Sequence, residues 1–212
     1  MTTLIWDWNG TLLNDLDLCI SSINRLLSKR ELPLLGRDVY KEVFSFPVKD
    51  YYERIGFDFS KEHFEVPARE FIDLYDNQVE KCPLHPAALA MLRYFREKGA
   101  RQFVLSAMKQ SMLKKTLEQK GIYRFFEGIA GLNDHYAVSK IERGRQLIRE
   151  FHIQRGTTWM IGDTNHDYET ARALEVKCIL VADGHQSEKR LKETGSRVVS
   201  TLDELRGTIP GD

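Results

Sequence analysis

Cysteine, net charge and long apolar runs are what this sequence has least of. Its 212 residues include three cysteines, Cys19, Cys82 and Cys178, and no two of them form a C-x-x-C pair. This usage does not match a zinc site or a disulfide scaffold, and it is typical of a reduced protein with buried thiols. We therefore expect a cytoplasmic protein.

The charges balance, because 31 basic side chains are matched by 31 acidic ones and the formal net charge is zero. This balance does not favour nucleic acid or an anionic membrane as a partner, since both select for a basic surface. No apolar run approaches the roughly 20 residues that span a bilayer. The first apolar run is interrupted by Asp7 and Asn9, unlike a secretory signal peptide. We expect a small ligand, with neither nucleic acid nor membrane as partner.

Proline is scarce and unevenly placed, since five of the six prolines lie between Pro33 and Pro86. The surrounding segment has helical spacing with breaks and contains no convincing strand. Before and after it, short apolar runs alternate with helical patterns, and Gly99 and Gly121 close two of the helices. This alternation predicts right-handed βαβ units, and therefore a parallel sheet with helices on both faces.

Polar side chains follow the predicted strands at the points where ligands bind in such sheets. Asp7 follows the first apolar run, and Ser106 and Asp163 follow two later ones. Lys140 begins a helix that comes after another strand. Each residue alone is a common turn former or cap, but the four together, in this order, indicate a site.

Two carboxylates, a hydroxyl and an ammonium group suit a magnesium ion and a phosphate. Mg²⁺ takes one or two carboxylates together with phosphate oxygens, and Ser106 and Lys140 supply the complementary groups for the phosphate. The backbone N–H groups of the turn at Gly10 and Thr11 could also cradle an anion. With its target screened by Mg²⁺ and Lys140, an aspartate could attack phosphorus and form an aspartyl-phosphate.

The motifs resemble those of the haloacid dehalogenase superfamily. Asp7-Trp8-Asn9-Gly10-Thr11-Leu12 is similar to its first motif, D-x-D-G-T-[LV], and Val104-Leu105-Ser106-Ala107 is similar to the second. Lys140 fits the third motif, and Gly162-Asp163-Thr164-Asn165-His166-Asp167 fits the fourth, G-D-x-x-x-D. Order and spacing match across nearly the whole chain, and the resemblance is strongest to the phosphoglycolate-phosphatase-like branch with a helical, C1-type cap.

The resemblance implies an α/β fold with a Rossmann-like parallel sheet flanked by helices and an inserted α-helical cap domain. The core would comprise residues 1–13 and 85–212, and the cap would comprise residues 14–84. The implied activity is that of a Mg²⁺-dependent phosphohydrolase acting on a small phosphorylated metabolite.

The resemblance also implies roles for individual residues. Asp7 would be the nucleophile and a Mg²⁺ ligand, with the backbone carbonyl of Asn9 and the carboxylate of Asp163 as further ligands. Asp167 would be an outer ligand or would orient Asp163 and Lys140. The phosphate would be held by the residues Gly10, Thr11, Ser106, Ala107 and Lys140.

Asn9 departs from the family pattern, in which this position is the aspartate that acts as general acid and base. An amide cannot shuttle a proton at neutral pH, and such catalysis is worth about 10²–10⁴ in rate. Three explanations stay open: a slow phosphatase or one in which another group, such as His166, does this work; a bond whose leaving group needs no such proton, as in phosphonate-cleaving and ATPase members; or an engineered Asp-to-Asn change. We favour a natural asparagine.

Two other function classes are considered. A relative that binds a phosphorylated ligand without turning it over stays an alternative. A response-regulator receiver domain is rejected, because it needs only a single small domain and carries its phosphorylated aspartate in mid-chain.

The cap segment would select the substrate. Lys49 or Arg54 could meet an acidic substrate tail, Phe46 or Tyr51 could shape the pocket, and His185, after the last predicted strand, could contact the substrate. Aromatic residues at helical spacing usually belong to the core, so the substrate itself is not readable from the sequence.

Overall fold

The computed structural model describes residues 1–132 and 139–209 and contains a six-stranded parallel sheet. The strands are β1 (Thr3–Trp6), β2 (Arg101–Lys109), β3 (Gly128–Leu132), β4 (Thr158–Gly162), β5 (Lys177–Val181) and β6 (Arg197–Val199). Their order in the sheet is β3-β2-β1-β4-β5-β6, and all neighbours run parallel. The predicted α/β class is therefore confirmed, with β1 at the centre.

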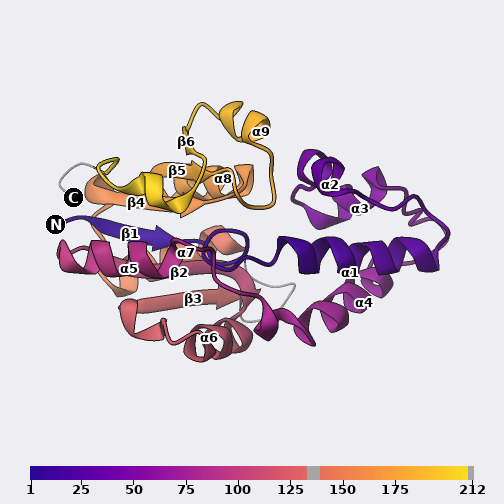
Figure 1. Ribbon diagram of the computed structural model, residues 1–212, viewed down its shortest axis with the longest axis horizontal. Coiled ribbons are helices and arrows are strands. Elements are labelled where there is room, and N and C mark those ends of the chain that lie inside the picture. The colour runs from indigo at the N-terminus through magenta and orange to yellow at the C-terminus, as the bar shows by residue number, and fades with distance from the viewer. Residues whose placement is uncertain (133–138, 210–212) are drawn as a thin grey trace.

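Helices cover both faces of the sheet (Figure 1). The helices of this part are α5 (Ala88–Glu97), α6 (Gln110–Gln119), α7 (Lys140–Glu150), α8 (Asn165–Leu174) and α9 (Glu188–Lys192). Successive side chains of a strand point to opposite faces, so Leu4 and Trp6 join the apolar cluster that contains α5 and α6, whereas Ile5 joins the cluster that contains α7 and α8. Full burial on both faces explains why β1 is an unbroken apolar run.

A group of helices lies beyond the carboxyl ends of the strands, at the right of Figure 1. It comprises α1 (Leu16–Lys29), α2 (Arg37–Val43), α3 (Val48–Arg54) and α4 (Glu65–Asp76). Two chain crossings join it to the sheet: the Asn14 N–H donates to the Pro83 carbonyl and the His85 N–H to the Leu12 carbonyl, both at 2.9 Å. These crossings lie at the predicted boundaries of the segment 14–84, whose status as a separate cap domain stays a prediction.

Short 3₁₀ turns complete the described elements: η1 (Val79–Lys81), η2 (Tyr123–Phe125), η3 (Arg155–Thr157) and η4 (Leu202–Leu205). The strand β6 and helix α9 were not predicted, because three and five residues are too few to give a clear periodic pattern.

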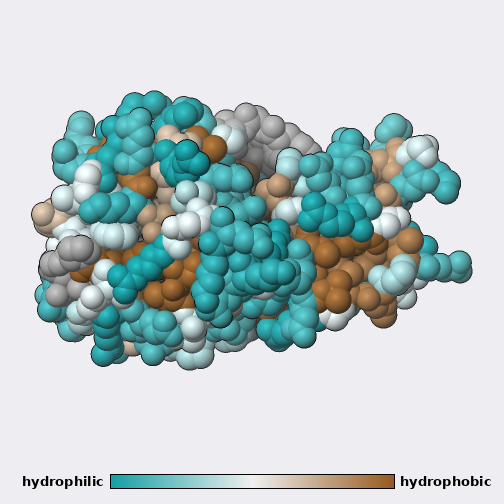
Figure 2. All heavy atoms as spheres, turned by 90° about the horizontal axis from the view of Figure 1, so that it is seen from above, coloured by the Kyte–Doolittle hydropathy of each residue, from teal (hydrophilic) through white to brown (hydrophobic). Residues whose placement is uncertain are grey.

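The surface is mostly polar, but apolar side chains also reach it at the end formed by α1 to α4 (Figure 2). The exposed large apolar residues from this segment are Leu34, Val39, Phe46 and Val66. Among the residues that the structure describes, no helix is long and apolar enough to cross a membrane.

Candidate active site

A buried lysine joins two aspartates at the carboxyl edge of the sheet. Asp7 directly follows β1, and its N–H donates to the Ile161 carbonyl at 2.8 Å, which continues the pairing with β4. Lys140, the first residue of α7, donates from Nζ to Asp7 Oδ1 at 2.5 Å and to Asp167 Oδ1 at 2.6 Å. All three side chains are buried, so the lysine fixes both carboxylates away from solvent.

Backbone and hydroxyl donors hold the two aspartates of the fourth motif. Asp163 follows β4 and accepts from the Thr11 hydroxyl at 2.9 Å and from the His185 N–H at 2.7 Å. Asp167 Oδ2 accepts from the Thr164 hydroxyl at 2.7 Å and from two backbone N–H groups, and forms a capping box at the start of α8. Asp167 therefore orients Lys140 from the first turn of a rigid helix.

The charged groups of this cluster shift one another's pKa values. Burial, reinforced by the Asp167 and Asp163 carboxylates, raises the pKa of Asp7 well above its ordinary range despite Lys140. Burial likewise raises the pKa of Asp163 to about 6. Burial alone would raise the pKa of Asp167, but Lys140 outweighs it and lowers that pKa. Two of the three carboxylates are thus under-compensated by the protein's own cations.

A divalent cation fits this arrangement. Oxygen atoms of Asp7, Asp163 and Asp167 lie within 4.8 Å of one another, and all three side chains are buried. Crowded, buried carboxylates repel each other unless a cation or protons lie among them. An all-oxygen donor set with carboxylates is the set that Mg²⁺ prefers, so the residues present fit the ion that the sequence predicts.

The amide of Asn9 is fixed by three neighbours. Its Oδ1 accepts from the Ser106 hydroxyl at 3.1 Å, and its Nδ2 donates to Asp15 Oδ2 at 2.9 Å and to the Tyr75 hydroxyl at 2.6 Å. These contacts determine which way the amide points, because the carboxylate of Asp15 can only accept. Since an amide does not titrate near neutral pH, Asn9 offers no proton for transfer at this position.

The predicted phosphate-binding residues are gathered at the same edge, but some of them already have partners. The Gly10 N–H donates to Asp15 Oδ1 at 2.8 Å and to the Leu13 carbonyl, and the Thr11 hydroxyl donates to Asp163. In this structure both groups support the loop. Ser106 and Ala107 lie within β2, which continues to Lys109 and shifts its register against β3 after Leu105.

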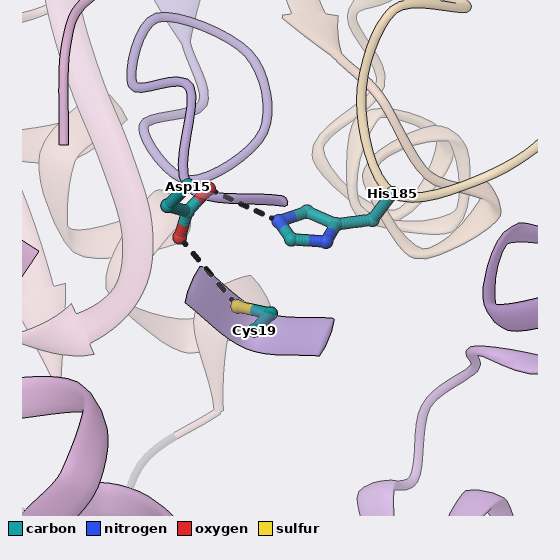
Figure 3. Close-up of side chains that lie close together, drawn as sticks. All are labelled: Asp15, Cys19 and His185. Atoms are coloured by element: carbon teal, nitrogen blue, oxygen red, sulfur yellow. Dashed lines mark hydrogen bonds and ion pairs between the residues drawn. The ribbon is translucent and has the colours of Figure 1, made fainter. Parts of the chain in front are cut away.

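A second buried cluster consists of Asp15, Cys19 and His185 (Figure 3). His185 Nε2 lies 3.1 Å from Asp15 Oδ1, and the Cys19 thiol donates to Asp15 Oδ2 at 3.9 Å. Burial would lower the pKa of His185, but the Asp15 carboxylate outweighs it and raises that pKa to about 9. The pair is thus an ion pair with balanced charge, in contrast to the carboxylates around Asp7, and it does not call for a metal ion.

A cavity of about 340 Å³ opens from Asp7 and Asn9 toward α1–α4. Three of the predicted specificity residues, Phe46, Tyr51 and His185, line it. Lys49 and Arg54 are not among its described lining residues, so the structure does not place them where the sequence analysis expected. The Lys49 ammonium lies 5.8 Å from the centre of the Phe59 ring, and Arg54 donates to the Val43 carbonyl at 3.2 Å.

Sequence reasoning missed Asp15 and Tyr75 as parts of the site. Tyr75, in α4, donates to Asp15 Oδ2 at 2.6 Å, so that the two residues join the helical segment to the loop after β1. Asp15 had a weak signal, since it follows the first motif closely. Tyr75 had none, because its approach depends on how α4 packs against α1.

Comparison with known proteins agrees with the fold and the motifs. The family model for the haloacid dehalogenase-like hydrolase matches residues 4–181. A tyrosine-protein kinase PtkA of Mycobacterium tuberculosis is 25% identical over 97% of this chain and 72% of its own. A phosphoglycolate phosphatase of Pseudomonas putida is 20% identical over 98% of this chain and 78% of its own.

Solved structures share the fold. The structure of a predicted phosphatase from Clostridium acetobutylicum superposes with a TM-score of 0.82 at 22% identity, covering 98% of this chain and 97% of that one. The structure of Mycobacterium tuberculosis PtkA gives the same TM-score and identity, covering 99% and 98%. The parallel sheet flanked by helices and the family match define a hydrolase with a Rossmann-like fold that is related to phosphatases. The chain belongs to the haloacid dehalogenase-like hydrolase family, which confirms the resemblance predicted from its motifs.

Proposed function

We propose that the protein is a Mg²⁺-dependent phosphohydrolase that acts on a small phosphorylated metabolite through an aspartyl-phosphate on Asp7. The observation that carries this proposal is the Lys140 bridge, in which one buried ammonium contacts both Asp7 and Asp167. A carboxylate held in this way, at the mouth of a cavity, is positioned to act as a nucleophile.

The reaction divides into two displacements at phosphorus. In the first, a carboxylate oxygen of Asp7 bonds to phosphorus while the bond to the leaving oxygen breaks, and the leaving oxygen keeps the electron pair and takes a proton from water. In the second, water replaces Asp7 on phosphorus and regenerates the carboxylate. Lys140 and Ser106 stabilise the charge of the transferring phosphoryl group. Asp7, Asp163 and the Asn9 carbonyl would hold Mg²⁺, which supplies positive charge against the phosphate oxygens.

Loss of the nucleophile is the direct test. Asp7→Asn keeps the shape of the side chain and is expected to lower phosphatase activity by at least about 10³-fold, because no covalent intermediate can form. Exposed Asp203→Asn serves as the matched control and should leave activity unchanged. Radiolabelled phosphate bound to the wild-type protein and released by hydroxylamine would identify the acyl phosphate. Retained activity in Asp7→Asn would refute the assignment.

Asn9 favours a second candidate, a weakly active or inactive protein that binds a phosphorylated ligand. Asn9→Asp separates the two. A protonated carboxyl at this position could still donate to Asp15, which lies 2.9 Å from the present amide nitrogen, and could protonate a leaving alkoxide. For alkyl phosphates kcat is then expected to rise about 10²-fold. A protein that only binds its ligand would form no phosphoenzyme in the wild type and would gain no turnover from the substitution.

A further inference from the structure

The cavity next to Asp7 has a strongly apolar wall. One group of rings comes from the segment around α2 and α3, where Phe44 lies 5.5 Å from Phe46 and 5.3 Å from Tyr51 between ring centres. A second pair comes from α4, where Phe71 and Tyr75 stack at 6.0 Å. A pocket of about 340 Å³ is at the lower end of the range for small ligands, so it suits one ring system rather than a protein surface.

Cations that could meet a second negative charge are scarce in this wall. Among the described lining residues, the lysines are Lys140, which is already bonded to Asp7 and Asp167, and Lys109, which is exposed. His166 packs on Phe46 at 4.7 Å between ring centres, and its Nδ1 lies 3.6 Å from Glu169. His185 also lines the cavity, but its charge is balanced by Asp15, whose Oδ1 lies 3.1 Å from His185 Nε2. Apart from the exposed Lys109, the described lining residues therefore offer no uncommitted cation to an acidic substrate tail, such as a carboxylate beside the phosphate.

Tyr51 contributes its ring to this wall rather than its hydroxyl. The hydroxyl oxygen is buried and has no hydrogen-bond partner among the described residues, so it is closed off from the cavity that the residue lines. The wall therefore favours a ligand that is largely apolar and carries few polar groups.

The amide of Asn9 points independently to the same class of leaving group. Held by Ser106, Asp15 and Tyr75, it cannot protonate the departing oxygen. An alkoxide needs that proton, whereas a phenol, with a pKa of about 10, can depart as its anion. In the first displacement, which kcat/KM reports, an aryl ester therefore loses little from the replacement of the usual aspartate.

We propose that the substrate is an aryl phosphate monoester, whose ring occupies the aromatic cavity and whose phenolate leaves without help from position 9; this rests on the proposed function. Asp7 bonds to phosphorus as the bond from phosphorus to the phenolic oxygen breaks. The electron pair stays on the phenolate, which takes its proton from water. Phe71 and Phe44 act as specificity residues that contact the ring.

The test compares substrates that share the phosphate and differ in the leaving group. The set contains 1-naphthyl phosphate, benzyl phosphate, 2-phosphoglycolate and acetyl phosphate, the last having a small leaving group that needs no acid. We expect kcat/KM for 1-naphthyl phosphate to exceed that for 2-phosphoglycolate by about 10²-fold or more. Benzyl phosphate, which has the ring but an alkoxide leaving group, should bind similarly and turn over more slowly.

A pair of cap variants tests the cavity itself. Phe71→Ala should lower the ratio of kcat/KM for 1-naphthyl phosphate to that for acetyl phosphate about tenfold. Phe59→Ala, a half-buried ring of the same segment that does not line the cavity among the described residues, should leave the ratio unchanged.

The outcomes separate the two proposals. If acetyl phosphate is hydrolysed through Asp7 but kcat/KM for 2-phosphoglycolate equals or exceeds that for 1-naphthyl phosphate, the aryl inference is wrong. The proposal that the protein is a phosphohydrolase is then unaffected. The inference is equally wrong if Phe71→Ala leaves the ratio unchanged. If acetyl phosphate is not hydrolysed and no phosphoenzyme forms, the proposed phosphohydrolase activity is refuted, and the aryl inference is refuted with it.

Discussion

Gly10 is a residue at which the backbone closely approaches the buried carboxylate of Asp163. A Cβ atom at this position would lie 2.3 Å from Asp163 Oδ2 and 2.4 Å from the His185 ring. The residue also has a φ of +74°, in the left-handed region. Close approach and backbone conformation therefore both require glycine here.

Gly10→Ala should be much more costly than Gly99→Ala. Gly99 has almost the same φ, +75°, but no atom lies within 4 Å of its Cβ position, so it isolates the backbone cost of about 1–2 kcal/mol. For Gly10→Ala we expect a loss of roughly 3 kcal/mol or more in the free energy of unfolding, together with most of the activity. Urea unfolding measures the free energy of unfolding of both variants. Equal losses would mean that the close contact with Asp163 relaxes without cost.

Among the elements, the crossing between the sheet and α1–α4 is tied to the loop after β5 by one histidine. His85 is buried, pairs through its backbone with Leu12, and places Nδ1 3.2 Å from Asp183 Oδ2. Burial lowers the pKa of His85, and Asp183 offsets this only in part. The folded protein therefore takes up the His85 proton at lower pH than the unfolded chain.

This difference predicts the pH dependence of stability. As the pH falls below about 6.5, the usual pKa of histidine, the unfolded chain is protonated first and the free energy of unfolding decreases. His85→Gln should therefore lose less stability between pH 7.5 and pH 5.5 than the wild type does. Urea unfolding at the two pH values measures this, with exposed His63→Gln as the control. A loss as large as that of the wild type would assign the dependence to other groups.

The alternation of elements could be predicted from the sequence because each periodic run is long and buried. Asp7, Ser106 and Asp163 end up together since parallel strands align their carboxyl ends. Ser106 nevertheless lies inside β2 rather than after it, because the strand continues through Ala107 and Met108 to Lys109 after the polar Ser106 has interrupted the apolar run. The ion pair of Asp15 and His185 joins residues 170 positions apart, and no local pattern encodes such a contact.

Considered as a whole molecule, the protein is neutral, yet its charges are distributed unevenly. The formal net charge is zero, while Asp7, Asp163 and Asp167 gather at one buried edge. Lys140 compensates part of this charge. The negative charge that Lys140 does not compensate destabilises the metal-free fold, because buried like charges repel each other. Stability and metal binding are therefore linked.

Mg²⁺ should stabilise the folded protein by binding to these carboxylates. A ligand at 100 times its Kd adds about 2.7 kcal/mol, which for a chain of this length corresponds to a rise in Tm of roughly 5–10 °C. Asp163→Asn should abolish the rise and, because it removes one repelling charge, should not lower the Tm measured in EDTA by a comparable amount. Exposed Asp203→Asn, far along the chain in η4, should keep the full rise. Thermal unfolding at matched ionic strength, with NaCl replacing MgCl₂, separates binding from screening. A full Mg²⁺-dependent rise in Asp163→Asn would place the ion elsewhere, since these carboxylates could then not be its ligands.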